Sequence, residues 1–350
     1  MKQDGSRAAR PRSAIEVSAE ASAEGRVDGA ESPESDRCLD GVRLIRRQEQ
    51  KYEMGAGAAA FLKEEISRRL PLYEFEPGQP TTYITTVYFD TLSRDFYQLA
   101  ERSYDDNIKI RLKEYYYDAP WRVRSGVSSD AGSAGRCTAK YLVSPYCYLE
   151  LKQRVAGFVV KKRFGIPKEI LSLLLNGQNI LPTLLRITPL GAARDLEAVY
   201  AELSRYLSEY TVGITSVVNY RRTVYQESEE SLRITFDDRL SVYAPPAQLY
   251  EGFEALTSDA LGIPIRKSDT VIIEIKCPGE YPQWLGEALR HHSKRRFSKF
   301  TSGVRLLLPG AKSKNGEIAS GGIVGQDVSP DHRSGAGGEA KTKRSDGLFN

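Results

Sequence analysis

Basic side chains alternate with aliphatic ones in the segment NIKIRLKEYYY, residues 107–117. Lys109, Arg111 and Lys113 are two residues apart, so a β-strand would place all three on one face. A row of cations on a strand either faces water or, where several strands present such faces to one another, binds an anion. Arg offers forked donors to phosphate oxygens and Lys offers point charges, so the pattern favours a phosphate ligand.

The same alternation recurs in other segments, and carboxylates stand among the cations. The basic residues that share these faces are Arg47, Lys51, Lys109, Arg111, Lys152, Lys161, Arg222, Arg233 and Lys276. The acidic ones are Glu49, Glu150, Asp237 and Glu274, whose oxygens are hard ligands suited to Mg²⁺ or Mn²⁺. Cations with scattered carboxylates are what a metal-bound polyphosphate or nucleoside triphosphate requires.

Eight strands are predicted to carry these residues. Each is bounded by turn-type residues or by a helix, and they lie at 43–54, 82–90, 107–117, 146–154, 157–164, 212–226, 231–243 and 270–277. Helices are predicted at 58–70, 167–176, 194–209 and 282–292. Because strands outnumber helices and short connections join several neighbours, we predict a mostly antiparallel α+β domain.

Two arrangements of the strands satisfy the pattern. In the first, the charged faces point to solvent and the apolar faces pack together in a common barrel. In the second, helices cover the apolar faces from outside and the charged faces line a shared interior, which must be hydrated and filled by an anion. The alternation alone favours neither, but the residue types favour the second. We therefore predict an eight-stranded antiparallel β tunnel, or barrel, with a charged interior and helices packed outside.

Composition divides the chain into one folded domain and two tails. Residues 1–40 and 311–350 lack periodicity and are poor in large apolar residues, so both are predicted to be disordered. The tunnel domain is predicted at 41–310, with a flexible Gly/Ser-rich insertion at 118–145. Residues 1–40 hold 6 basic and 9 acidic side chains and residues 311–350 hold 6 and 5, so the net charge rises from +4 for the chain to +6 within the domain. This moderate excess permits an anionic ligand.

Several classes of protein are disfavoured. The 4 cysteines show no CxxC spacing and there are only 3 histidines, which argues against a Cys/His zinc site. No apolar run approaches the ~18 residues of a membrane span and no signal-like segment begins the chain, so we predict a cytoplasmic protein without a span of its own. A membrane partner stays open, as does the oligomeric state. No nucleic acid is expected, because the cations alternate with aliphatic residues rather than aromatic platforms.

Two further motifs receive a structural interpretation. The sequence from Gly55 to Ala60 approaches a dinucleotide fingerprint, but the strand before it is charged, whereas the central parallel strand of such a fold is continuously apolar. These glycines are interpreted as a strand-to-helix turn. Cys277 lies beside Pro278 at a strand end and is interpreted as a packed thiol rather than a nucleophile.

Eight short motifs occur in the order in which a known family has them. They are RQEQKY, KIR, LELK, VKKRF, NYRRTVYQ, LRITFD, IEIKCPGEYPQWL and RRFSKFTSGV. Over about residues 43–308 they resemble the blocks of the VTC (vacuolar transporter chaperone) catalytic domain. Each block alone is weak, but eight in order are specific. That family makes inorganic polyphosphate from ATP and belongs to the triphosphate tunnel metalloenzymes.

The resemblance implies roles for individual residues. The cations expected in catalysis are Lys51, Lys109, Arg111, Lys152, Lys161, Arg222 and Arg233. Those expected to bind substrate are Arg47, Arg296 and Lys299, to which the alternation adds Lys276, and Glu274 is implied to be the metal-holding carboxylate. Lys109 stands where the family often has Arg, and Arg296 where Lys is common, so charge is retained at both. Arg47 replaces the first Glu of the E-x-E-x-K pattern of the wider superfamily, which favours the polymerase branch over the triphosphatases.

We therefore predict an ATP-dependent inorganic polyphosphate polymerase. Its partners are ATP and polyphosphate, and its cofactor is Mn²⁺ or Mg²⁺, with Glu49, Glu150 and Asp237 as further candidate ligands beside Glu274. Two alternatives use the same interior. One is hydrolysis of triphosphate or polyphosphate, with water replacing the acceptor phosphate, and the other is a non-catalytic module that binds polyphosphate or nucleotide.

Overall fold

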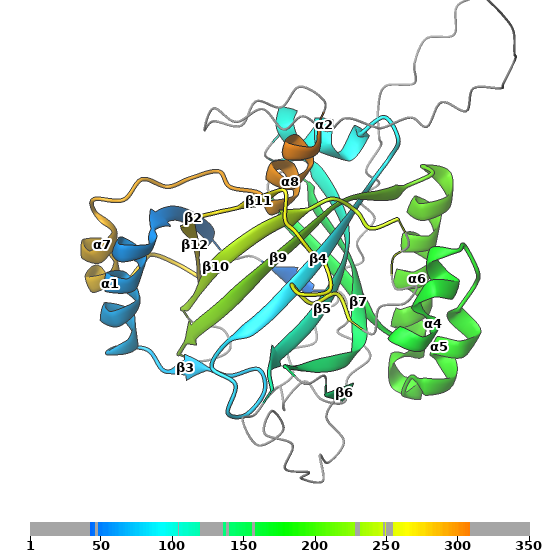
Figure 1. The fold of residues 1–350 in the computed structure, drawn as a ribbon, viewed down its shortest axis with the longest axis horizontal. Coiled ribbons are helices and arrows are strands. Elements are labelled where there is room, and N and C mark those ends of the chain that lie inside the picture. The colour runs from blue at the N-terminus through cyan, green and yellow to red at the C-terminus, as the bar shows by residue number, and fades with distance from the viewer. Residues whose placement is uncertain are drawn as a thin grey trace, which may run out of the picture. The chain divides into compact units, whose positions relative to one another are not determined.

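One antiparallel sheet organises the domain (Figure 1). The computed structural model describes residues 43–45, 48–103, 105–119, 136–137, 140–155, 158–227, 232–247, 249 and 255–308. Along the sheet the strands follow the order β1 (Arg43–Ile45), β8 (Phe158–Pro167), β7 (Tyr141–Val155), β5 (Asn107–Asp118), β4 (Thr82–Asp90), β9 (Gly213–Gln226), β10 (Arg233–Tyr243), β12 (Thr270–Cys277) and β2 (Gln48–Gly55). The short strands β3 (Leu72–Tyr73), β6 (Arg136–Cys137) and β11 (Arg266–Lys267) pair with β9, β7 and β10.

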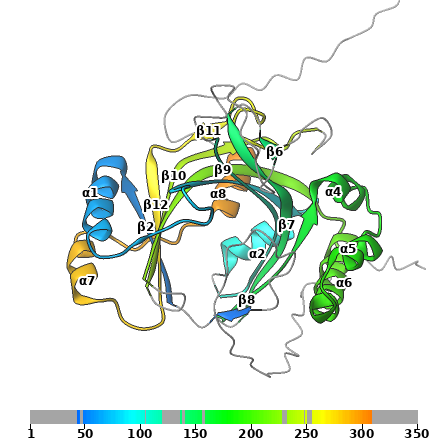
Figure 2. The ribbon, with the colours of Figure 1, turned by 90° about the horizontal axis from the view of Figure 1, so that it is seen from below.

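The N-terminal segment brings the two ends of this sheet together. β1 pairs with β8 at one end and β2 pairs with β12 at the other. Only residues 46 and 47 separate them along the chain, and three peptide units span at most ~11 Å. No ladder joins β1 to β2 directly within the described residues, so the sheet is curled about its interior rather than closed by hydrogen bonds (Figure 2).

The predicted strands match the observed ones closely. The predicted strand 43–54 corresponds to β1 and β2 together, and the other seven correspond to β4, β5, β7, β8, β9, β10 and β12. The predicted α+β class with an antiparallel sheet is thus confirmed. The insertion predicted at 118–145 is too wide, because Asp118 still belongs to β5 and Tyr141 already begins β7. Residues 120–135 and 138–139 within it, and both predicted tails, lie outside the described residues.

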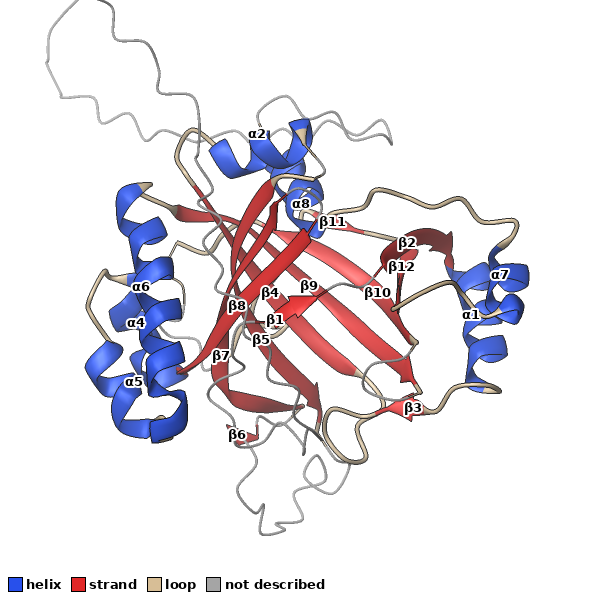
Figure 3. Ribbon diagram, turned by 180° about the vertical axis from the view of Figure 1, so that it is seen from behind, coloured by secondary structure: helices blue, strands red, loops and turns tan. Residues whose placement is uncertain are grey.

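The helices lie on the outer side of the sheet and at one end of its strands. α1 (Ala56–Ser67) and α7 (Gln283–Leu289) lie beside β2 and β12, whereas α4 (Lys168–Leu175), α5 (Leu181–Ile187) and α6 (Ala193–Glu209) lie beside β7 and β8 (Figures 1 and 2). α2 (Asp95–Arg102) and α8 (Lys299–Leu307) sit together at one end of the strands (Figure 3). No described helix combines the length and apolar character needed to cross a bilayer.

Burial shows which faces of the strands point outward. Ile108, Ile110 and Leu112 of β5 are almost completely buried and share one core with Leu196 and Leu203 of α6. Each such side chain stabilises the fold by about 1.5–3 kcal/mol when fully buried. The apolar faces therefore pack against the helices, and the alternating charged faces must point into the interior of the sheet. This is the second of the two predicted arrangements.

Candidate active site

Strand register lines up three lysines inside the sheet. Lys109 of β5 lies opposite Lys152 of β7, which lies opposite Lys161 of β8. Like charges directly opposite one another on neighbouring strands are destabilising, and no carboxylate shares this rung of three residues. The carboxylates that pair with Lys152 and Lys161, Glu49 and Glu150, belong to other positions of the sheet, so the three ammonium groups side by side form a place where an anionic ligand can bind.

The next rung is organised by a buried carboxylate. Glu150 is completely buried and lies opposite Arg111 on β5 and Arg163 on β8. Its carboxylate is 2.7 Å from Arg111 Nε, 3.3 Å from Lys161 Nζ and 3.5 Å from Lys113 Nζ. Burial alone would raise the pKa of Glu150, but Arg111, Lys113 and Lys161 outweigh burial and hold the pKa well below its usual value. Glu150 is therefore an ionised counter-charge for the wall.

A second buried carboxylate holds cations on the opposite wall. Asp237 of β10 lies opposite Arg222 of β9, whose guanidinium donates to both carboxylate oxygens at 2.6 and 2.8 Å. Lys299 of α8 adds a third donor at 2.5 Å. Burial would raise the pKa of Asp237, but Arg222 and Lys299 lower it. Such fork-to-fork pairing fixes the guanidinium while leaving its remaining N–H groups for another acceptor.

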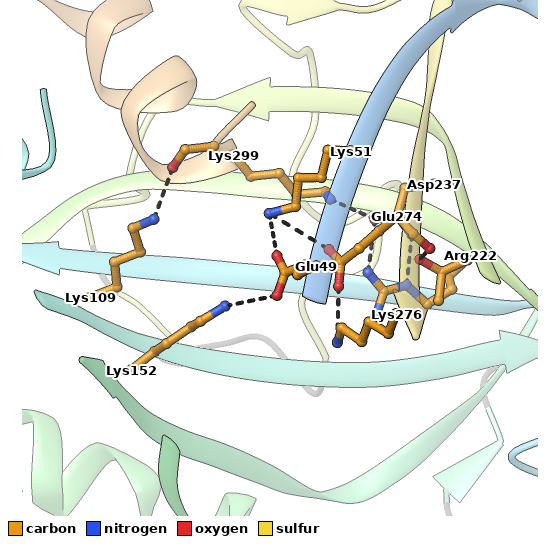
Figure 4. Close-up of polar contacts among 11 residues, drawn as sticks. Glu49, Lys51, Lys109, Lys152, Arg222, Asp237, Glu274, Lys276 and Lys299 are labelled. Atoms are coloured by element: carbon orange, nitrogen blue, oxygen red, sulfur yellow. Dashed lines mark hydrogen bonds and ion pairs between the residues drawn. The ribbon is translucent and has the colours of Figure 1, made fainter. Parts of the chain in front are cut away.

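The edge formed by β2 and β12 carries four alternating charges. Lys51 lies opposite Glu274, and Glu49 lies opposite Lys276. Lys51 Nζ is 2.7 Å from Glu49 Oε1 and 3.7 Å from Glu274 Oε2, and Lys276 Nζ is 2.9 Å from Glu274 Oε1. Lys152 reaches Glu49 Oε2 at 3.6 Å although β7 and β2 are not paired, so this ion pair crosses the interior (Figure 4).

Burial, with neighbouring cations, lowers the pKa of Lys109 and Lys152. Burial, followed by Lys152, Lys51 and Arg111, lowers the pKa of Lys109 to about 7. Burial also lowers the pKa of Lys152 to about 8, although Glu49 opposes the shift. An anion in the interior would reverse these shifts, because it favours the charged form of both lysines.

The start of α8 completes the interior. Ser298 is the N-cap of α8: its Oγ accepts from Thr301 N and also from Lys109 Nζ, each at 3.3 Å. Lys299 Nζ lies 4.4 Å from the centre of the Tyr220 ring as well as against Asp237. In Figure 4 Lys299 reaches the Asp237 carboxylate, whereas Lys109 points toward the start of the helix.

The structure brings most of the predicted site residues together, with exceptions. Lys51, Lys109, Arg111, Lys152, Lys161, Arg222, Lys276 and Lys299 line the interior with the four predicted carboxylates. Arg233, the first residue of β10, lies opposite Lys276 and over the rings of Tyr73 and Phe75, at 5.7 and 5.4 Å. Arg296 is exposed, and Arg47 lies outside the described residues.

Three interior residues were not among the predicted site residues. Lys113 and Arg163 extend the same alternation by one step beyond Arg111 and Lys161, so the pattern itself contained the signal. Ser298 has the residue type of an N-cap directly before a helix, which is a local signal, but its approach to Lys109 depends on tertiary packing.

The carboxylates fit a divalent metal only if phosphate supplies further ligands. Within the described residues no three His, Cys, Asp or Glu side chains are grouped so that they could hold a metal ion. Glu150 and Asp237 are occupied by arginine and lysine. Glu49 and Glu274, which share the Lys51 ammonium, remain as a pair. Mg²⁺ is often held by one or two carboxylates together with substrate phosphates, and this pair meets that requirement.

Comparison with solved structures gives distant resemblances. A protein from Hippeastrum, described as a candidate adenylyl cyclase with a dominant triphosphatase activity, is 17% identical with a TM-score of 0.37, over 75% of this chain and 98% of that one. A candidate adenylate cyclase from Bacillus halodurans is 13% identical with a TM-score of 0.34, over 72% and 90%. At these values neither supports a conclusion about function. A search among curated proteins found no match.

The sequence profile of one domain family covers most of the described fold. The VTC domain matches residues 46–123 and 135–308, which include β2 to β5 and β6 to α8. Every interior cation and carboxylate described above falls within these two ranges. The chain therefore belongs to the VTC-domain family, a class of polyphosphate-related tunnel enzymes.

Proposed function

We propose that this chain is an ATP-dependent polyphosphate polymerase, which transfers the γ-phosphoryl group of ATP to the end of a polyphosphate chain in the tunnel. The observation that carries this proposal is the rung of Lys109, Lys152 and Lys161, which has no carboxylate of its own. Phosphoryl transfer depends mainly on positioning and on neutralising charge, and a wall of fixed cations supplies both.

The spread of the cations supports a chain-like substrate. Lys109, Arg111 and Lys113 follow one another on β5 at every second residue, about 7 Å apart along the strand. Lys161 and Arg163 repeat this spacing on β8. Contacts thus continue along the tunnel, which suits an extended row of phosphates better than a single phosphate group.

The state of the carboxylates favours a phosphate acceptor over water. A general base for water works best with a pKa near the operating pH. Burial and Glu274 raise the pKa of Glu49, but the neighbouring lysines prevail and lower it to about 2, and Glu150 and Asp237 are likewise held ionised by their cations. These groups are poor bases, whereas the terminal oxyanion of a phosphate chain can attack without first losing a proton.

A divalent metal is part of the proposal. Glu49 and Glu274 would hold Mg²⁺ or Mn²⁺ together with phosphate oxygens, and the bound ion would neutralise charge on the group being transferred. The lysines and arginines of the strands then bind and align the two phosphate chains. Glu150 and Asp237 keep those cations in place.

The test is to incubate the protein with ATP and Mn²⁺ and to separate the products by size. Long polymer supports the proposal, orthophosphate alone would indicate a hydrolase, and tight binding without turnover would indicate a binding module. Lys161 and Lys162 provide a matched pair on β8, since Lys161 faces Glu150 inside and Lys162 pairs with Glu202 of α6 outside. Lys161→Ala should lower polymer synthesis by about 10- to 100-fold, the value of a charge-assisted contact, and Lys162→Ala should leave it nearly unchanged.

A further inference from the structure

Lys51 stands between two carboxylates in a pattern set by strand register. Glu49 and Lys51 share one face of β2, and Glu274 and Lys276 share the facing positions of β12. Because the strands are antiparallel, each carboxylate lies opposite a lysine and diagonal to the other carboxylate. The interior position between Glu49 and Glu274 therefore attracts a cation from either strand.

Each of the four carboxylate oxygens of Glu49 and Glu274 forms an ion pair with a lysine. Glu49 Oε1 and Glu274 Oε2 face Lys51 at 2.7 and 3.7 Å, while Glu49 Oε2 faces Lys152 and Glu274 Oε1 faces Lys276. Lys51 is the one lysine among these three that pairs with both carboxylates, as Figure 4 shows. Its ammonium thus fills the position that a divalent ion bridging the pair would need.

We propose that Lys51 is an internal counter-ion that occupies this cation position and admits a divalent metal only when a phosphate chain draws its ammonium away. This inference rests on the proposed function, because it requires a phosphate chain in the tunnel. An ammonium and a divalent ion cannot share the space between Glu49 and Glu274, since their charges repel at such short range. Incoming phosphate oxygens give the Lys51 ammonium another partner, and its flexible stem allows the move.

The consequence is an order of binding. The metal enters with the phosphate chain or after it, and free metal does not occupy the empty tunnel. Such an arrangement keeps the two carboxylates compensated while the tunnel is empty, because a buried unpaired carboxylate is costly. It also couples the choice of metal to the presence of substrate.

The test measures Mn²⁺ bound to the intact protein, by electron paramagnetic resonance of the free ion, without any phosphate compound. Wild type should bind Mn²⁺ weakly, and Lys51→Met should bind it at least about tenfold more tightly, because the competing charge is gone. Lys276→Met is the matched control: it removes one charge beside Glu274 without clearing the position between the carboxylates. The affinity of Lys276→Met for Mn²⁺ should rise clearly less than that of Lys51→Met. Adding Glu274→Gln to Lys51→Met should abolish the rise in affinity.

A second arm uses β,γ-imido-ATP at saturation. Wild type should bind Mn²⁺ in the presence of the analogue but not in its absence. Glu274→Gln is the control that measures the Mn²⁺ held by the analogue alone. Lys51→Gln serves if Lys51→Met does not fold. Equal affinity of wild type and the Lys51 variant for Mn²⁺ alone would overturn the proposal, as would an equal gain in Lys276→Met. Failure of wild type to make polymer would overturn the proposed reaction but not this inference, whose readout is bound metal.

Discussion

Lys109 is expected to take up a proton when phosphate binds beside it. It is surrounded by Lys152, Lys51 and Arg111, and burial with these neighbours lowers its pKa to about 7 from an ordinary value of 10.5. Between these two values the unfolded chain holds more protons than the folded one, so the free energy of unfolding rises with pH across that window. A bound phosphate chain acts in the opposite direction, because it favours the charged ammonium.

Binding of tripolyphosphate should therefore take up protons above pH 7 and weaken as the pH rises toward 9, by at most roughly tenfold per pH unit for one coupled group. Calorimetry in buffers of different ionisation enthalpy measures the uptake. Lys109→Arg should reduce the uptake and flatten the pH dependence, because Arg stays charged throughout. The ligand titrates identically in both experiments, so equal uptake by wild type and variant would contradict this role for Lys109.

The alternation of residue types predicted which face of each strand is charged, but not which charges meet. Lys152 and Glu49 are paired across the interior although their strands are not neighbours, and no local pattern encodes that contact. Arg233 lies opposite Lys276 and so keeps the interior face that the alternation predicted, but its contact with the rings of Tyr73 and Phe75 was not predicted by that pattern. Side-chain partners beyond the adjacent strand depend on how the sheet curls.

At the scale of elements, the strands were easier to predict than the helices. β5, with its strict alternation, agrees with its prediction to within one residue. α6 agrees with its prediction, and its buried residues Leu196, Val199 and Leu203 recur at helical spacing. α2, α5 and α8 were not predicted, whereas α4, which is equally short, was predicted because Pro167 stands at its start and Gly177 just past its end. α2 depends on a nearby capping contact, in which the Asp90 carboxylate accepts from the backbone N–H groups of Phe96 and Tyr97.

α8 owes its position to a glycine. A Cβ atom on Gly303 would lie 3.1 Å from Ser216 Oγ and 3.3 Å from a methyl of Val218, both on β9. The helix can thus approach the sheet closely only without a side chain here. Because Ser298 and Lys299 begin the same helix, this contact sets how far they reach into the tunnel.

Gly303→Val should push α8 away from β9, lower the free energy of unfolding by about 1–3 kcal/mol through overpacking, and weaken tripolyphosphate binding. Denaturant unfolding and calorimetry measure the two effects. Gly286→Val in α7 is the matched control, since nothing lies within 4 Å of a Cβ there and affinity should not change. If Gly303→Val kept wild-type affinity, the placement of Ser298 and Lys299 by this contact would be wrong.

At the scale of the whole sheet, one short segment holds two distant edges. β1 covers the edge of β8 and β2 covers the edge of β12, with residues 46 and 47 between them. An uncovered edge strand offers unpaired N–H and C=O groups to other chains. The N-terminal segment therefore both encloses the cations and protects the sheet from association.

Removing residues 1–45 should leave β2 paired with β12 but expose the edge of β8, which β1 covers. The affinity for tripolyphosphate should then fall at least about tenfold, and the protein should self-associate through the exposed edge of β8. Light scattering and calorimetry report these changes. A chain that lacks only residues 1–40 keeps β1 and should behave as wild type, in line with the predicted N-terminal tail. A monomer with full affinity after the longer deletion would show that β1 does not hold the sheet together.

The pairing of β2 with β12 also affects the order in which the domain folds during synthesis. During synthesis β2 leaves the ribosome among the first elements of the domain, yet residues 48–55 find their partner only when residues 270–277 have been made. Until then the strand that bears Glu49 and Lys51 has no neighbour in the sheet, and contacts so far apart in sequence form slowly. The tunnel is thus assembled last, after the rest of its wall exists, and a nascent chain that stalls before β12 exposes an unpaired charged strand to the cell's folding machinery.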